Sequence, residues 1–491
     1  MRLLALMLLL VTVAGCLDND DVPEPEPAEE PVDLTPRASG RIPVAPDPSV
    51  FLGTVANSHA TGQPDHVGHQ IGALHDGSHN LRLLDHNTLQ DGLLQPAGGF
   101  TELHVVNDTA VVTSLTSTRG ATLVDVSDPS NLRVLSHIYN ADDNWDGRIS
   151  EDGKYLFLGC QGSGAFDCTG LDPAAETPTV TGGGPCTPVG TGGTPLPLPE
   201  MGCPGGIAIY NIEDLTVPRF VGYLPMSFTH NVFTFMIDGL YYFVNASGTV
   251  GEYDAINNEY RVASNNITAT HDIAVQQHPI TGQWILYTGS MGMSLWDMAD
   301  PFNPTLMSQV DASEYEEPIA PLWHEQTPMP CLIDGRHYTI GAGEDGVTAL
   351  PGPIGVVDTT DPLNPVYVGD WILPDRPNLS GPQLNYRFSL HNIDANCDGQ
   401  VAVGHYHAGV WVFDISSAER AANPVTLAYY MPHELAIGPF YSPVVTAPIG
   451  ALVSADVPNV WTAQWSKDGQ TLFIPDMTTG MYALEPTWEF E

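Results

Sequence analysis

IGVVDTTDPLNPVYVGDWILP, at residues 354–374, is the clearest copy of a phrase that recurs along this chain of 491 residues. Alternating apolar residues lead to an Asp, an Asp-Pro turn follows, and a second alternating run leaves the turn. Because side chains of a strand point alternately to its two faces, the phrase predicts a β-hairpin. Related phrases stand at 120–139, 206–225, 249–263, 292–311, 409–432 and, truncated, 480–486. Such self-similarity is typical of repeat folds.

A second hairpin precedes most of these phrases, with an apolar run, a tight Asp-Gly turn and an aromatic strand, as at 230–245 and 461–476. Because one hairpin cannot bury its own face, we expect two to join into a four-stranded antiparallel unit. Units repeated around an axis form a β-propeller, so we predict an all-β fold with seven blades. The strand-like segment His79–Leu89 is expected to pair with the last blade and close the ring. Eight blades is the alternative, if residues 50–99 hold a full blade.

The VDVSDP and VVDTTDPLNP phrases resemble the LVIVD repeat of prokaryotic surface β-propellers. The resemblance covers most of residues 79–486. It implies a propeller exported to the cell surface. It implies no particular activity, because that family is largely defined by its repeat.

The N-terminal residues 1–16, MRLLALMLLLVTVAGC, combine one Arg, a short apolar core and small residues before a Cys. This predicts a lipoprotein signal peptide with Cys16 as the lipidated residue; an ordinary signal peptide is the alternative. Residues 17–48 are acidic and rich in Pro, which predicts an extended tether. Residues 49–78 are expected to be a lead-in or cap, and 79–491 the propeller. We therefore expect an exported prokaryotic protein, lipid-anchored to the outer face of a membrane, at the cell surface or in the periplasm.

The charge of the chain is strongly acidic, with 58 Asp plus Glu against 15 Lys plus Arg and a net charge of −43. Such a field repels nucleic acid and anionic lipid head groups. We therefore exclude nucleic acid as a partner and expect membrane contact only through the lipid. A saline habitat explains the charge most simply, because salt screens the self-repulsion.

Seven Cys divide into Cys16 and an even set of six, as expected for disulfides in an oxidising compartment. Four of the six lie in or beside an insertion at 161–205 that is rich in Gly, Pro and Thr: Cys160, Cys168, Cys186 and Cys203. Their pairing is left open by the sequence. Cys331 and Cys397 precede equivalent turns of neighbouring blades and are expected to bridge. A metal cluster is the less favoured alternative, because no Cys-x-x-Cys spacing is present.

The long insertions are predicted to share one end of the propeller, where we expect the binding site. They are residues 161–205, 312–322, 375–389 and 432–460. The same end is predicted to carry a His at the start of the inner strand in five blades, joined by two at the end of a second strand. These are His104, His230, His271, His324 and His391, with His405 and His407.

Two interpretations of the histidines remain open. Each His either caps its strand, or several converge to bind Cu, Fe or Zn, since neutral imidazole suits these ions. The first favours a binding, adhesion or scaffold module whose loop-rich face takes an unknown protein, glycan or small molecule. The alternative is an extracellular metal-dependent enzyme, for example an oxidoreductase, that uses the His cluster.

A calcium site is also predicted at DDNWDGRIS, residues 142–150. Its oxygen-bearing side chains match positions 1, 3, 5 and 9 of an EF-hand loop, with Gly147 at position 6. They are Asp142, Asn144, Asp146 and Ser150. The acidic residue usual at position 12 is replaced by Gly153, and Asp and Asn also favour simple turns.

Overall fold

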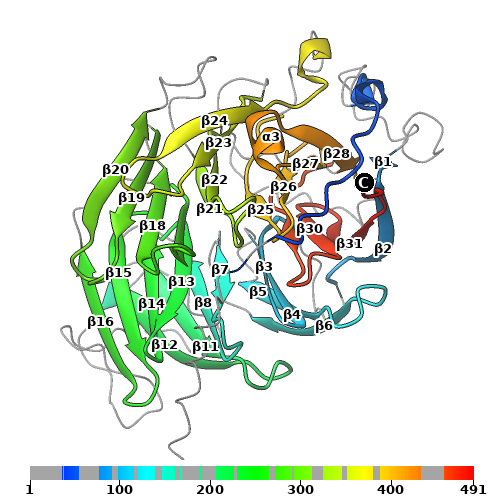
Figure 1. Cartoon of the computed structure of the whole chain (residues 1–491). Helices are drawn as coiled ribbons and strands as arrows, with labels where there is room; N and C mark the ends of the chain where they lie inside the picture. Colours follow the sequence, from blue (N-terminus) through cyan, green and yellow to red (C-terminus); the bar gives the residue numbers. More distant parts are fainter. Residues whose placement is uncertain are drawn as a thin grey trace, which may run out of the picture. The chain divides into compact units, whose positions relative to one another are not determined.

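The computed structural model describes residues 36, 38–54, 77–90, 98–114, 120–138, 146–160, 166–167, 187–188, 206–225, 229–264, 267, 271–289, 292–311, 324–344, 351–379, 388–432 and 458–491. The chain divides into two compact units, 1–34 and 35–491, and the described residues belong to the second. They form seven antiparallel sheets arranged as the blades of a β-propeller (Figure 1). The predicted fold class is confirmed with seven blades, and the alternative of eight is wrong.

The strands of a blade follow one another from the axis outward. Blade one contains β3 (Phe100–Val106), β4 (Thr109–Ser114), β5 (Ala121–Asp125) and β6 (Arg133–Ile138). Blade two contains β7 (Gly147–Ile149), β8 (Tyr155–Cys160), β11 (Gly206–Asn211) and β12 (Arg219–Pro225). Blade three contains β13 (Val232–Ile237), β14 (Leu240–Asn245), β15 (Thr249–Asp254) and β16 (Glu259–Ser264). Blade four contains β17 (Ile273–Gln277), β18 (Trp284–Gly289), β19 (Gly292–Asp297) and β20 (Thr305–Asp311).

The remaining blades follow the same order. Blade five contains β21 (Glu325–Pro328), β22 (Tyr338–Ala342), β23 (Ile354–Asp358) and β24 (Val366–Trp371). Blade six contains β25 (Ile393–Ala395), β26 (Gln400–Gly404), β27 (Val410–Asp414), β28 (Val425–Tyr430) and the short β1 (Ser78–His79). Blade seven contains β29 (Gln464–Trp465), β30 (Leu472–Asp476), β31 (Gly480–Pro486) and β2 (Leu81–Asn87). Outside the blades, β9 (Phe166–Asp167) pairs with β10 (Thr187–Pro188).

The inner strands contact one another around a complete ring, in the order β3, β7, β13, β17, β21, β25, β29 and again β3. The outermost strand of blade seven comes from the start of the propeller. There β2 pairs antiparallel with β31, from Leu81 opposite Pro486 to Asn87 opposite Met481. Between the blades, apolar side chains from facing sheets form the core, as where Trp371 stacks on Phe413.

The Asp that ends the third strand of the repeated phrase has a local structural role. Its carboxylate accepts a hydrogen bond from the backbone N–H two residues later, as Asp125 does from Ser127 and Asp358 from Thr360. The Asp of the Asp-Pro turn does the same, as Asp361 does from Leu363. Two consecutive Asx turns therefore reverse the chain, because the carboxylate replaces a backbone acceptor. This explains why the phrase keeps its two Asp residues.

Among the described residues, short helices and one disulfide complete the fold. They are η1 (Pro48–Phe51), η4 (Arg376–Asn378) and α3 (Ala418–Ala422). The predicted bond between Cys331 and Cys397 is confirmed, with the two Cα atoms 4.9 Å apart, and it joins blades five and six. The backbone of Cys160 ends β8, whereas Cys168, Cys186 and Cys203 lie outside the described residues.

Part of the segment predicted as a tether packs on the propeller. The Leu332 N–H donates to the Pro36 carbonyl, and the Ala38 N–H donates to the Leu332 carbonyl. The Arg41 guanidinium lies 3.7 Å from the centre of the Phe490 ring. The folded unit therefore includes residues from Pro36 onward. Cys16 and the rest of the predicted signal peptide lie outside the described residues, and no described helix is long and apolar enough to cross a bilayer.

Candidate functional site

Four of the predicted histidines form a row along the inner strands of consecutive blades. His230, His271, His324 and His391 each stand just before the inner strand of blades three, four, five and six. Their ring centres are 4.7, 4.0 and 4.3 Å apart in that order. Trp461 of blade seven extends the row, 3.8 Å from His391. The repeat therefore brings these four imidazoles together, as the sequence predicted.

His104 does not occupy the equivalent position, so its predicted place in the row is wrong. It lies within β3 and pairs with Val111, after an irregularity in register between Phe100 and Leu103. Its Nδ1 accepts a hydrogen bond of 2.9 Å from the Ile149 backbone N–H, which ties blade one to blade two. Burial lowers the pKa of His104 well below its usual value and keeps it a neutral acceptor.

His405 and His407 are both buried and flank Tyr406. The Nδ1 of His405 lies 3.1 Å from the carbonyl oxygen of Phe388. Burial lowers the pKa of His405 to about 4, against the opposing effect of that carbonyl. His405 therefore has a structural partner, and neither residue belongs to a group of described side chains close enough to share a metal ion.

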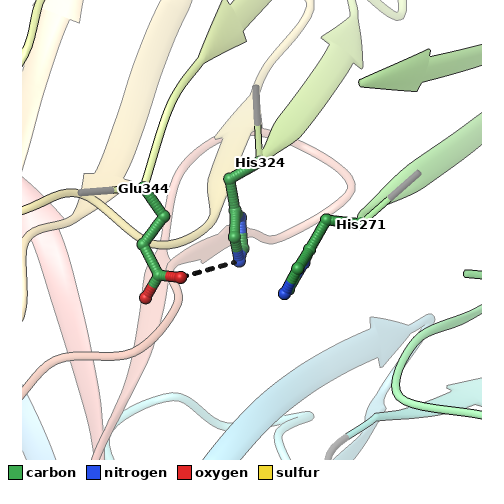
Figure 2. Close-up of side chains that lie close together, drawn as sticks. All are labelled: His271, His324 and Glu344. Carbon is green, nitrogen blue, oxygen red and sulfur yellow. Dashed lines mark ion pairs between the residues drawn. The ribbon is translucent and has the colours of Figure 1, made fainter. Parts of the chain in front are cut away.

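Among the described residues, one group of His, Cys, Asp and Glu side chains is close enough to share a metal ion. It consists of His271, His324 and Glu344. One ligand atom from each lies within 4.8 Å of the others. The Nε2 of His324 is 3.7 Å from Oε2 of Glu344, and the two imidazoles stand side by side (Figure 2). His230 and His391 flank this group in the row.

The Asp272 carboxylate lies beside both imidazoles of the group and bonds to that of His271. One of its carboxylate oxygens lies 3.1 Å from Nδ1 of His271, and the other lies 3.5 Å from Nδ1 of His324. A carboxylate on one ring nitrogen fixes the tautomer and leaves the other nitrogen as the ligand atom. Asp272 thus has the geometry of an orienting partner for His271, and its second oxygen lies near His324.

The electrostatics of the row differ from one His to the next. Burial lowers the pKa of His271, but the hydrogen bond to Asp272 and the charges of Asp272 and Glu344 outweigh it, and the pKa is raised. Burial, together with the neighbouring His271, lowers the pKa of His230 to about 3. His271 therefore lies where negative charge attracts a cation, whereas His230 is neutral at neutral pH.

A layer of buried and half-buried acidic groups lies next to the histidine row. Asp272 and Glu325 directly follow row histidines, and Glu102 and Asp146 hold the same position in blades one and two. Arg148 lies 3.3 Å from Asp146 and 4.0 Å from Glu102. Burial, with the charge of Asp146, raises the pKa of Glu102 to about 8, and burial raises that of Glu325 well above its usual value.

This acidic layer also connects the blades. The Asp146 carboxylate accepts a 2.9 Å hydrogen bond from the Val232 backbone N–H of blade three. The Glu325 carboxylate accepts one from the Ile393 N–H of blade six. The layer therefore fixes the inner strands against one another and supports the row of imidazoles.

Sequence reasoning missed Glu344 and Tyr406. Glu344 lies just beyond β22, in the sequence GAGEDG, and Tyr406 donates a hydrogen bond to its Oε1. Neither residue stands at a repeated position of the phrase, so the repeat gave no indication of them. The pair GE at 343–344, which directly follows β22 at the end where the long insertions were predicted, was the available signal.

The predicted calcium ligands are only partly described. Asp142 and Asn144 lie outside the described residues. The Asp146 carboxylate contacts the Val232 N–H and Arg148. Ser150 donates to Asp152 at 2.7 Å and accepts from the Tyr155 N–H at 3.0 Å. The side chains of both described residues therefore have protein partners, and calcium binding stays a prediction.

No protein-family model matches the chain, and no curated protein matches it. Solved structures of propellers are similar over most of their length. The WD40 repeats of RRP9 are 12% identical, with a TM-score of 0.47 over 83% of this chain and 97% of that one. A chain of the mitotic checkpoint complex is 9% identical, with a TM-score of 0.49 over 84% and 96%. Kuenenia stuttgartiensis hydrazine synthase is 9% identical, with a TM-score of 0.47 over 81% and 99%. These likenesses assign no function.

Proposed function

We propose that this protein is a binding module that holds a first-row transition-metal ion with His271, His324 and Glu344. The observation that carries the proposal is the place of the Asp272 carboxylate, which bonds to Nδ1 of His271 at 3.1 Å and lies 3.5 Å from Nδ1 of His324. A carboxylate behind each ligating His is the usual outer partner in metal sites. In this proposal it turns Nε2 of both rings toward the Glu344 carboxylate.

The chemistry of the ligands favours particular ions. Two imidazoles and one carboxylate suit Zn²⁺ or Fe²⁺, and imidazole also accepts Cu²⁺. Ca²⁺ is disfavoured, because it prefers a shell of oxygen ligands only. The charges of Asp272 and Glu344, which raise the pKa of His271, favour a cation further.

Metal-dependent catalysis is a second candidate function, favoured by the ligand count and by access. Three protein ligands leave a coordination position for water or a substrate, as in catalytic zinc sites. The His271 side chain is 39% exposed, so solvent reaches the site. A binding module needs no open coordination position. Such a position would, however, also allow a partner to supply the last ligand.

We also propose that the protein is anchored at a cell surface through Cys16, as the resemblance to LVIVD-repeat propellers implies. Pro36 bonds to Leu332, in the turn that joins β21 to β22, whereas His324 precedes β21. These residues therefore lie at opposite ends of one inner strand. The described chain therefore begins at the end of β21 that is opposite the proposed metal site.

Titration of the purified protein with Zn²⁺ by calorimetry tests the metal proposal. The wild type is expected to bind one equivalent. His324→Gln should weaken binding by at least about 100-fold, because a ligand is lost. His137→Gln is the matched control, since His137 bonds to Thr122 on the outer strands of blade one. Equal binding by wild type and His324→Gln would contradict the proposed ligands.

A further inference from the structure

Tyr406 contacts the proposed ligand group from outside it. Its hydroxyl donates a hydrogen bond to Oε1 of Glu344. The other carboxylate oxygen, Oε2, is the one that lies 3.7 Å from Nε2 of His324. The two oxygens of Glu344 therefore have different neighbours, with a phenol on one and an imidazole of the ligand group on the other.

The backbone of Tyr406 is held in an unusual conformation. Its φ angle is 43°, in the left-handed region that a bulky side chain rarely adopts. Such a conformation is strained and persists where the surroundings impose it. In this turn the Tyr406 N–H donates to the Val460 carbonyl at 2.9 Å, and the Val460 N–H donates back at 3.0 Å. Blade seven thus holds the turn of blade six in this strained form.

The ring of Tyr406 is fixed as firmly as its backbone. It is almost fully buried, with ring centres 5.4 Å from His391 and 5.6 Å from Trp461. Both contacts are close to perpendicular, an arrangement that aromatic pairs prefer. The phenol therefore meets the carboxylate of Glu344 without a further loss of side-chain freedom.

We propose that Tyr406 is a positioning residue that makes Glu344 a ligand through one oxygen only. The inference rests on the metal binding proposed above. With Oε1 held by the phenol, Oε2 alone is available to the ion, so two imidazoles and one carboxylate oxygen leave coordination positions open. Without the phenol, the carboxylate is free to rotate and to chelate the ion through both oxygens or to turn toward water. Tyr406 thereby sets both the affinity and the coordination number of the site.

Metal binding to the full-length Tyr406→Phe variant tests this role, with Zn²⁺ titration for affinity and the visible spectrum of bound Co²⁺ for coordination. We expect a 10–100-fold loss of Zn²⁺ affinity, about the usual effect of removing an outer partner, and a changed Co²⁺ spectrum. Tyr287→Phe is the matched control, because the Tyr287 hydroxyl is buried in β18 without a hydrogen-bond partner among the described residues. The control should bind both ions as the wild type does.

The outcomes separate this role from metal binding itself. Wild-type affinity and an unchanged Co²⁺ spectrum in Tyr406→Phe would overturn the role of Tyr406 and leave the proposed function standing. A wild type that binds neither ion would overturn the proposed function, and the role with it. If Tyr406→Phe does not fold, Tyr406→Asn replaces it, because Asn tolerates the left-handed conformation. The same loss is expected there, and wild-type binding would again contradict the role.

Discussion

The imidazole rings of His271 and His324 lie with their centres 4.0 Å apart, although the two residues are 53 positions apart in the chain. Each stands before the inner strand of its blade, and those strands, β17 and β21, contact each other at the axis. Repetition alone therefore brings the two rings together. Glu344, which does not belong to the repeat, completes the candidate site.

Asp272→Asn is predicted to weaken Zn²⁺ binding by about 10–100-fold. The neutral amide no longer supports the two imidazoles through their Nδ1 atoms. The fold should be retained, because Asn231 and Asn392 hold the equivalent position in blades three and six. Calorimetric titration measures the effect. Asp297→Asn, in a turn where it accepts from the Ala299 N–H, is the control, and equal affinities in all three proteins would refute the orienting role.

Arg148→Met is predicted to lower the free energy of unfolding by about 3 kcal/mol, because the buried Asp146 carboxylate loses its cation. The comparison is Arg133→Met, which removes an exposed pair with Asp125 in which the side chains are 61% and 16% exposed. That change should cost about 0–1 kcal/mol. Urea denaturation of both variants gives the difference. Similar losses of unfolding free energy in Arg148→Met and Arg133→Met would show that the acidic layer does not depend on Arg148.

The acidic layer also predicts a loss of stability at higher pH. The pKa of Glu102 is raised to about 8 by burial and the charge of Asp146, from an ordinary value of 4.5. The folded state therefore holds a proton that the unfolded state releases. The contribution of this proton to the free energy of unfolding is complete below about pH 4.5. It is lost as the pH rises through about 8, by at most about 1.4 kcal/mol per pH unit.

Glu102→Gln should flatten this dependence, because the amide does not titrate. Denaturation midpoints of chelator-treated protein between about pH 5 and 8 provide the measurement. Glu485→Gln, whose side chain is 39% exposed near the end of β31, is the control and should follow the wild type. An unchanged slope in Glu102→Gln would show that Glu102 does not hold the proton.

Reduction of the bond between Cys331 and Cys397 is predicted to destabilise the propeller by about 4 kcal/mol, the loop entropy released for a separation of 66 residues. The double variant Cys331→Ala/Cys397→Ala should show the same loss without reductant and no further loss with it. Thermal unfolding with and without dithiothreitol measures both effects. A double variant as stable as the oxidised wild type would contradict a stabilising bridge between blades five and six.

The architecture was predictable because it depends on local chemistry that repeats. Each phrase contains its own strand alternation and its own Asx turns, such as those of Asp358 and Asp361, so the hairpins follow from the sequence. The row of His230, His271, His324 and His391 followed in turn, since equivalent positions of adjacent blades must meet. The bridge between Cys331 and Cys397 was predicted by the same reasoning.

The wrong prediction for His104 and the failure to predict Glu344 and Tyr406 arise where the repeat is broken. The irregular register between Phe100 and Leu103 shifts blade one, so a local match of Leu103-His104 to the other blades was misleading. Glu344 and Tyr406 lie beyond the ends of strands, where only the tertiary fold determines what a side chain meets. The left-handed backbone of Tyr406 depends on Val460 of another blade, and no local pattern predicts that.

The metal content of the protein after dialysis against Zn²⁺ tests the central claim most directly. Elemental analysis should find one zinc per chain in the wild type and in His137→Gln, and none in His271→Gln/His324→Gln. The same amount of zinc in the wild type and in the double variant, or none in either folded protein, would contradict a metal site formed by these two histidines.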